Sequence, residues 1–268
     1  MESHQQQKDL VRAQFTRTAQ VFGDYAVTSR VAEAEQLARM VIAGGSDCAV
    51  DLACGPGTLA LRFARHVRWI CGLDLTPAIL ERARRSAAAD GLANLDFAIG
   101  DAQSLPFADG SLDIAVTSYS LHHFPDAART IGEMARVVKR GGRVGILDIF
   151  LPNDPQVSEL NNRIEILRDA SHTRTLAREE FESHFAAHGL RILETSVEEN
   201  SRSFDHWMLV AGSKPGDRPY IEVRRLMEAS MADDAAWFHP RFAPAEDGSG
   251  ARELIFTNTT LFVAGEKI

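Results

Sequence analysis

Hydrophobic and polar positions follow a repeating pattern over residues 47–150. Short apolar runs alternate with stretches in which apolar residues recur every three or four positions, as on one face of a helix. The expected strands are CAVDLA, WICGLDL, LDFAIGD, SLDIAVTS and RVGILDIF, with helices expected up to residue 66, from Pro77 to Asp90 and over 126–139. This alternation predicts right-handed crossovers and a mostly parallel sheet. Because the strands are apolar at nearly every position, we expect both faces of the sheet to be covered.

The segments on either side of this region have other patterns. Two amphipathic helices are expected before it, over residues 8–22 and 29–43. After residue 150 the proline-bearing segment LPNDPQ interrupts the pattern, and helices are expected at 155–170 and 177–188. RILETSVEE and the final ELIFTNTTLFVAGEKI are expected strands, separated by helix and loop over 201–250. This order predicts a hairpin at the sheet edge with inserted helices, which would roof the carboxyl ends of the strands.

One stretch, VDLACGPGTLALRFAR at residues 50–65, carries the strongest functional signal. Asp51 ends an apolar run, a turn with Gly55 and Gly57 follows, and an amphipathic helix then begins. A strand, a tight loop and a helix place a helix N-terminus where a nucleotide-like ligand can sit. A second acid, Asp74, ends the next expected strand. Its separation from Gly55 is close to the roughly 20 residues that are typical between a glycine turn and a ribose-binding acid.

Composition narrows the classes of function. The chain has 268 residues and a net charge of -8, which disfavours nucleic acid as the main partner because clustered Lys and Arg grip phosphates. Cys48, Cys54 and Cys71 show no CxxC spacing and are expected to be reduced, which favours a cytoplasmic protein. The polar N-terminus has no signal-peptide pattern, and no apolar run approaches about 18 residues, so no membrane span is expected. No His and carboxylate spacing predicts a metal site.

Four segments together resemble a known family. They are DLACGPGTLALRFA, GLDLTPAILERARR, GDAQSLPFADGSLDIAVTSYSLHHFPD and ARVVKRGGRVGILD. In this order they resemble the class I S-adenosylmethionine-dependent methyltransferases, most closely the small-molecule group (methyltransferase type 11) that includes the ubiquinone and menaquinone C-methyltransferases. The resemblance covers about residues 20–150.

The resemblance implies an α/β fold with a Rossmann-like, mostly parallel seven-stranded sheet, helices on both faces and an antiparallel C-terminal edge strand. It also implies three parts of the chain. Residues 1–46 would form N-terminal helices that cover the cofactor site, and residues 47–150 would form the cofactor-binding core. Residues 151–268 would supply the edge strands, with a helical substrate cap inserted at about 200–250.

Matched by position, the resemblance assigns the residues near the methionine part of S-adenosylmethionine. Asp51 lies near the amino group, and the backbone of Ala53, Cys54, Gly55 and Gly57 approaches this part. The family often has glycine where this chain has Ala53. If that position requires a positive φ angle, alanine is costly there. An alternative for Asp51 is a structural role as a helix N-cap, for which Asp is among the favoured residues.

The resemblance also assigns the nucleoside contacts. Asp74 holds the two ribose hydroxyls and Leu75 flanks the adenine, while Asp101 and Ala102 read the adenine edge with Gln103 beside them. An alternative for Asp74 is a cap on the helix that follows it. A dinucleotide would use a similar acid, but its pyrophosphate calls for G-x-G-x-x-G, and only a G-x-G core is present here. A nicotinamide oxidoreductase is therefore disfavoured.

The remaining assignments lie around the reacting centre. Ser118 and Tyr119 line the floor near the sulfonium, and Tyr25 covers the cofactor's carboxylate. Transfer of a methyl group to a hydroxyl or an acidic carbon needs a base, for which His122 and His123 are the candidates because they follow the fourth strand. The alternative is that either histidine caps or packs within the following turn.

Other polar residues have structural interpretations that we favour. Asp148 ends the fifth strand of the core and is expected to form a loop hydrogen bond. His206 and Trp207 could line a substrate pocket, but helix packing is the preferred interpretation. Surface or packing roles are expected for His172, His184 and His188.

The sequence therefore predicts an enzyme that transfers a methyl group from S-adenosylmethionine to a small organic acceptor, through C, O or N. The alternative is a binding protein of the same fold that catalyses a non-methylating reaction, such as cyclisation or decarboxylation. A regulatory or scaffold role is a further alternative. A homodimer is possible, and the acceptor itself is not predicted.

Overall fold

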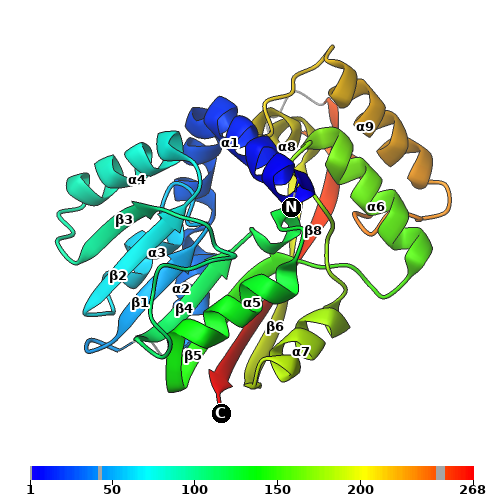
Figure 1. The fold of residues 1–268 in the computed structure, drawn as a ribbon. Helices are drawn as coiled ribbons and strands as arrows, with labels where there is room; N and C mark the ends of the chain where they lie inside the picture. Colours follow the sequence, from blue (N-terminus) through cyan, green and yellow to red (C-terminus); the bar gives the residue numbers. More distant parts are fainter. Residues whose placement is uncertain (1, 42–43, 246–250) are drawn as a thin grey trace.

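The computed structural model describes residues 2–41, 44–245 and 251–268, which form a central β-sheet with helices on both faces (Figure 1). The strands are β1 (Cys48–Leu52), β2 (Trp69–Asp74), β3 (Leu95–Ile99), β4 (Leu112–Ser118), β5 (Val138–Ile149), β6 (Leu190–Ser203), β7 (Arg241–Pro244) and β8 (Arg252–Lys267). The helices are α1 (Glu2–Ser29), α2 (Val31–Met40), α3 (Thr58–Phe63), α4 (Pro77–Ala89), the 3-10 turn η1 (Leu121–His123), α5 (Ala127–Val137), α6 (Pro155–Arg168), α7 (Arg178–Ala187), α8 (Phe204–Val210) and α9 (Arg218–Ser230).

The strand order is β3-β2-β1-β4-β5-β8-β6, and β7 pairs with β8. Strands β1 to β5 run parallel, whereas β8 is antiparallel to both β5 and β6. The predicted mostly parallel sheet and its C-terminal antiparallel hairpin are confirmed. Seven strands form the main path as expected, but the sheet has an eighth strand, the four-residue β7. Its sequence RFAP is too short to give a periodic signal.

Two apolar cores hold helices against the two faces of this sheet. Successive strand residues point to opposite faces, so Ala49 belongs to one core while Val50 belongs to the other. The first core packs Leu37 of α2 and Phe63 of α3 against one face, and the second packs helices α5 and α7 against the other, the latter through Phe181. Both faces are therefore covered, which accounts for strands that are apolar at nearly every position.

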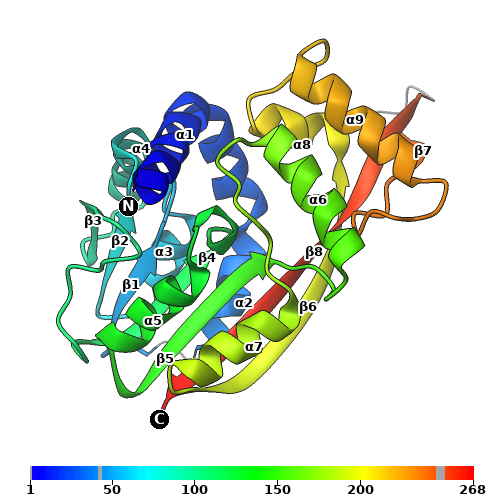
Figure 2. The same cartoon turned by 45° about the vertical axis from the view of Figure 1, so that its right-hand side comes forward.

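A third core lies above the outer part of the β6–β8 hairpin (Figure 2). It joins α6, α8 and α9 to β8 through residues that include Ile164, Phe204, Met227 and Phe256. We call this layer of three helices the cap. The inserted helices expected within 201–250 are present as α8 and α9, although residues 246–250 lie outside the described residues. The cap also includes α6, which precedes the predicted insertion.

Helix α1 is longer than the predicted helix over 8–22, and polar side chains along it form long-range contacts. Lys8 forms an ion pair with Asp101 at 2.6 Å, and Asp24 pairs with Arg82 of α4. The spacing of apolar residues in the sequence does not predict such long-range polar contacts. Although α1 has 28 residues, neither it nor any other helix in the described parts of the chain is long and apolar enough to cross a membrane.

Candidate functional site

The turn between β1 and α3 is built from left-handed backbone. The φ angles are 49° at Ala53, 53° at Gly55 and 83° at Gly57. Glycine adopts this conformation without steric cost, whereas an L-residue loses roughly 1–2 kcal/mol there. The sequence expectation that alanine is costly at position 53 if φ is positive therefore applies. The strain lies at the carboxyl end of the central strand, where strained backbone often marks a functional site.

Asp74 ties this turn to the end of β2. Its Oδ2 accepts the backbone N–H of Gly55 at 2.9 Å, and its Oδ1 accepts the backbone N–H of Thr76 at 2.8 Å. Burial raises the pKa of the Asp74 carboxyl, although these two backbone donors act in the opposite direction. A carboxylate offers about four lone-pair sites, so each oxygen retains one for a further donor.

Asp74 and the turn line a narrow, mainly apolar cavity at the carboxyl ends of the strands, which we call the first cavity. Phe15 and Phe22 of α1 also line it, as does Leu147 of β5. Eight of the residues assigned to the cofactor lie on its wall: Ala53, Cys54, Gly55, Asp74, Leu75, Ala102, Ser118 and Tyr119.

Asp51, which was assigned near the cofactor's amino group, does not line the first cavity. Its side chain is 1% exposed, and Oδ2 accepts the backbone N–H of Ala60 in the first turn of α3 at 3.1 Å. Oδ1 is buried without a partner in the described structure. Burial raises the pKa of Asp51, and the charge of Asp74 adds to this effect. The hydrogen bond of Oδ2 to the first turn of α3 agrees with the alternative that Asp51 has a structural role at a helix N-terminus.

Three other assigned residues also lie off this wall. Gly57 begins α3, where an added Cβ would meet Phe97 at 3.1 Å. Asp101 accepts the backbone N–H of Gln103 and pairs with Lys8, so its carboxylate is engaged with the protein. The Gln103 side chain donates to the Asp126 carbonyl at 2.8 Å. The contacts of Asp101 and Gln103 shape the loop that follows β3. Of residues 100–103 in this loop, only Gly100 and Ala102 line the first cavity.

A second cavity of about 600 Å³ lies between α1, the cap and the end of the sheet. Tyr25, which was assigned to the cofactor, lines this cavity and not the first. His206 and Trp207 also line it, while Trp207 packs on Phe256 as expected. Residues shared by the walls of both cavities are Phe15, Phe22, Arg30, Tyr119 and His123. The two cavities therefore adjoin one another.

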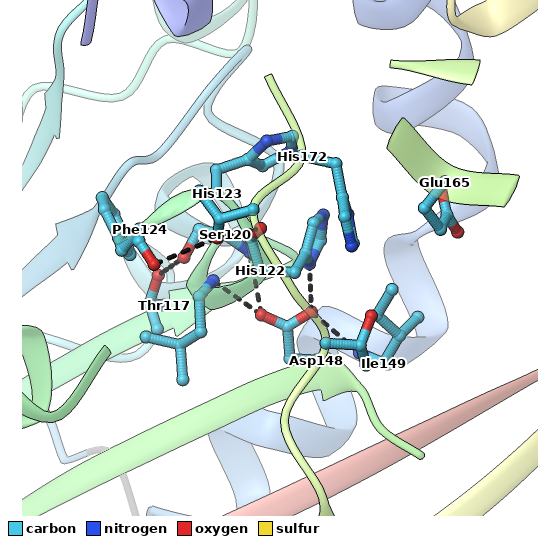
Figure 3. Close-up of polar contacts among 12 residues, drawn as sticks. Thr117, Ser120, His122, His123, Phe124, Asp148, Ile149, Glu165 and His172 are labelled. Atoms are coloured by element: carbon cyan, nitrogen blue, oxygen red, sulfur yellow. Dashed lines mark hydrogen bonds and ion pairs between the residues drawn. The ribbon is translucent and has the colours of Figure 1, made fainter. Parts of the chain in front are cut away.

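Asp148 and His122 form a buried pair beside these cavities (Figure 3). His122 Nδ1 lies 2.6 Å from Asp148 Oδ1, and Asp148 Oδ2 accepts the backbone N–H groups of Ser120 and Leu121. The expected loop hydrogen bond of Asp148 is thus present, with the histidine bond in addition. Because a carboxylate only accepts, His122 carries its proton on Nδ1, which leaves Nε2 free to accept another. His122 lines the second cavity.

The three neighbouring histidines differ in protonation. Burial lowers the pKa of His122, but the charge and hydrogen bond of Asp148 outweigh burial and the pKa is raised. Burial and the adjacent His122 lower the pKa of His123 to about 4. Burial also lowers the pKa of His172 strongly. His122 is therefore the member of this cluster whose protonated form the surroundings favour. No set of three His, Cys, Asp or Glu side chains in the described structure could hold a metal ion.

Sequence reasoning missed several residues of this region. His172 has the packing role that was one of its two expected roles: it is buried, and its ring stacks on that of His122 with centroids 5.4 Å apart. Glu165 of α6 faces the same cluster in Figure 3 and lines the second cavity. Arg30 and Arg202 also line it. Glu165 lies in the last turn of α6 and Asp169 directly follows the helix, so their closeness in sequence was an available signal; the two arginines had none.

Tyr119 is the second strained residue of the site, with a φ angle of 51°. Its backbone N–H donates to Leu147, and its hydroxyl donates to Glu33 at 2.8 Å. The Arg30 guanidinium carbon lies 3.8 Å from the centre of its ring. Burial raises the pKa of the Tyr119 hydroxyl well above its usual value, as does Glu33. Tyr119 therefore stays neutral and connects α2 to the wall between the cavities.

The cysteines of the site are unpaired. Cys48, Cys54 and Cys71 are all free thiols, as expected from their spacing. Burial raises the pKa of Cys54 well above its usual value, and Asp51 and Asp74 add to the effect. Burial likewise raises the pKa of Cys71 to about 11. The Cys54 and Cys71 thiols therefore stay protonated at neutral pH, and Cys54 contributes a small apolar surface to the first cavity.

Comparison with known proteins identifies relatives over most of the chain. A family model described as "Methyltransferase domain" matches residues 49–142. The uncharacterized methyltransferase YcgJ of Bacillus subtilis is 33% identical over 221 residues, which cover 81% of this chain and 85% of that protein. A demethylmenaquinone methyltransferase of Desulfitobacterium hafniense is 38% identical over 110 residues, but these cover only 40% of this chain and 44% of that protein.

Solved structures agree with the fold. The crystal structure of YcgJ has a TM-score of 0.77 at 27% identity and covers 88% of this chain and 98% of that one. A geranyl diphosphate C-methyltransferase of Streptomyces coelicolor, solved with S-adenosyl-L-homocysteine, has a TM-score of 0.61 at 17% identity. The match covers 88% of this chain and 78% of that methyltransferase. At this identity it supports the fold alone.

The strained turn makes one prediction about stability. We expect Ala53→Gly to raise the free energy of unfolding by about 0.5 kcal/mol, because relief of left-handed strain exceeds the added entropy of glycine in the unfolded chain. Ala88→Gly, at an exposed position of α4, is the control and should lower it by about 1 kcal/mol. Urea unfolding measures both. Equal losses in the two variants would contradict the assignment of strain to Ala53.

The Asp148–His122 pair makes a second prediction. NMR titration should place the pKa of His122 above its ordinary value of about 6.5, and Asp148→Asn should bring it below that value because burial then dominates. Since the folded state favours the protonated form, the pair's contribution to stability is fully present below about pH 6.5. It is lost as the pH rises through the raised pKa. Asp233→Asn, on the surface, should leave the titration unchanged.

Proposed function

This chain belongs to the class I S-adenosylmethionine-dependent methyltransferases, and we propose that it transfers a methyl group from S-adenosylmethionine to a small organic acceptor held in the second cavity. The observation that carries the proposal is that the two cavities share part of their walls, including Tyr119 and His123. A donor in the first cavity and an acceptor in the second would meet there, and such alignment of two reactants supplies much of the rate in group transfer.

The residues of the first cavity fit the cofactor. Asp74 has one spare lone pair on each oxygen after its bonds to Gly55 and Thr76, which suits two ribose hydroxyls. Leu75 and Ala102 would flank the purine with apolar surface, and the left-handed turn at Gly55 would present backbone to the methionine part. S-adenosylmethionine supplies an electrophilic methyl group on a sulfonium, so the protein's task is to bind, orient and accept a proton.

We assign the base to His122 and a positioning role to His123. Asp148 holds the Nδ1 proton of His122, so that Nε2 is free to take a proton from an acceptor hydroxyl or acidic carbon in the second cavity. His123 differs because its Nδ1 bonds to the Ser171 carbonyl at 3.0 Å and its pKa is low. It contacts α1 through Phe15, at 5.2 Å between ring centroids.

The direct test is to incubate the protein with S-adenosylmethionine and a library of small acceptors, and to look by mass spectrometry for S-adenosylhomocysteine together with a methylated product. If the cofactor binds and a substrate is consumed without either product, the non-methylating alternative replaces this proposal. The sequence leaves open whether C, O or N is methylated, and the possible homodimer and the cytoplasmic location remain predictions of the sequence.

The base assignment predicts that His122→Gln reduces turnover by about 10²- to 10⁴-fold while affinity for S-adenosylhomocysteine stays the same. In the unsubstituted protein the rate should increase as the pH rises through the raised pKa of His122, because only the neutral imidazole accepts a proton. His188→Gln, on α7's C-terminal side, is the control. Full turnover in His122→Gln would remove His122 as the base.

The cofactor assignment predicts that Asp74→Ala weakens the binding of S-adenosylhomocysteine by about 1–3 kcal/mol, since two hydroxyl donors lose a charged acceptor. Isothermal titration calorimetry measures the change. Asp96→Ala, on the neighbouring strand β3 and outside both cavities, is the matched control and should bind as the unsubstituted protein does. Unchanged affinity in Asp74→Ala would reject the ribose contact.

A further inference from the structure

Arg202 is a cation without a partner on the wall of the second cavity. It ends β6, and within the described residues its guanidinium forms no hydrogen bond and no ion pair, while its Nε is fully buried. Burial alone lowers the pKa of Arg202 to about 10, with no acid near enough to oppose it. Buried donors are nearly always satisfied in proteins, so one that faces a cavity calls for an explanation.

Two more unpartnered polar groups lie beside it. The Nε of Arg30 is also buried without a hydrogen-bond partner. The hydroxyl of Tyr25 is likewise buried and has no partner. The guanidinium carbons of Arg30 and Arg202 lie 5.5 Å and 5.4 Å from the centre of the Tyr25 ring. Contact with a ring face stabilises a cation but fills none of its N–H donors. Three donors from α1, the start of α2 and the end of β6 thus gather around one ring.

The acids of the second cavity are mostly committed elsewhere. Glu165 pairs with Arg168 at 3.2 Å, and Asp169 accepts from Ser171. Glu33 accepts from Tyr119, and its pKa is raised by burial and by Glu198, although Arg30 opposes this. Glu253 also lines the cavity, on β8. Glu198 of β6 lines it as well. Within the described residues none of these acids forms an ion pair with Arg202, whose pKa is affected by burial alone.

We infer that the acceptor carries an anionic oxygen group, a carboxylate or a phosphate, which Arg202 binds with Arg30 and Tyr25 beside it. This inference rests on the proposed function, since it identifies the class of molecule that occupies the second cavity. A guanidinium presents its donors in a planar fork that matches carboxylate and phosphate oxygens. Trp207 and the Tyr25 ring supply apolar surface for the rest of the molecule, so a small aromatic or alkyl acid fits the cavity.

Binding measurements test the inference without any need for turnover. The probes are benzoate, octanoate and phenyl phosphate, with benzamide, octanamide and benzyl alcohol as their neutral counterparts, each titrated by calorimetry in the presence of S-adenosylhomocysteine. At least one anion should bind more tightly than its neutral counterpart, and the ranking of benzoate against phenyl phosphate distinguishes carboxylate from phosphate. If no anion exceeds its counterpart, the inference is wrong.

Variants locate the effect. Arg202→Met should weaken the preferred anion about 10- to 100-fold, as expected for loss of charged hydrogen bonds, and leave the neutral probe unchanged. Tyr25→Phe should weaken it by a smaller factor. Arg225→Met, at an exposed arginine on α9, is the matched control and should bind the anion normally. Unchanged anion affinity in Arg202→Met would overturn the inference.

Two further readouts separate binding from structure and from the proposed function. Because Arg202→Met removes a buried Nε that has no hydrogen-bond partner, its thermal midpoint should rise or stay the same, and a fall would assign Arg202 a structural role instead. Affinity for S-adenosylhomocysteine should be unchanged in this variant. If the unsubstituted protein binds anions but not S-adenosylhomocysteine, the proposed function fails while the anion site stands.

Discussion

The geometry of both cavities depends on one buried carboxylate, that of Asp148. It is 1% exposed, and it accepts the backbone N–H groups of Ser120 and Leu121 as well as His122 Nδ1. A charge at this depth is tolerated only when its lone pairs are filled, so the loop after β4 must stay where its amides meet the carboxylate. This constraint keeps Tyr119 in a left-handed conformation and directs His122 towards the second cavity.

Helix α1 connects the core to the cap and closes the space between them. Lys8 binds Asp101 on the core side, and Gln14 donates to the Ala211 carbonyl on the cap side. Phe15 and Phe22, which follow these anchors along the helix, contribute to both cavities. The wall between the two cavities therefore belongs to an element that is fixed from both sides, and a shift of the cap would move the wall of the first cavity with it.

The sequence predicted the features that local patterns encode. The alternation of strands and helices follows from spacing, and the glycine turn and Asp74 follow from a short motif. Contacts between distant segments have no such signal. The position of Asp51 behind the wall depends on how α3 packs, and the stacking of His172 on His122 depends on a loop 50 residues further along the chain. The convergence of Arg30 and Arg202 depends on the path of β6, so neither arginine was identified.

The two cavities divide recognition between different kinds of groups. The wall of the first cavity is mostly backbone turn and small or apolar side chains around Asp74, whereas the second carries charged groups from α2, α6, β6 and β8. The unpaired guanidinium of Arg202 costs desolvation in the free protein, and only a ligand that brings an anion recovers that cost. A neutral molecule of the same shape would cover the guanidinium without supplying acceptors for its N–H donors. Selectivity therefore comes from the penalty on wrong ligands as much as from contacts to the right one.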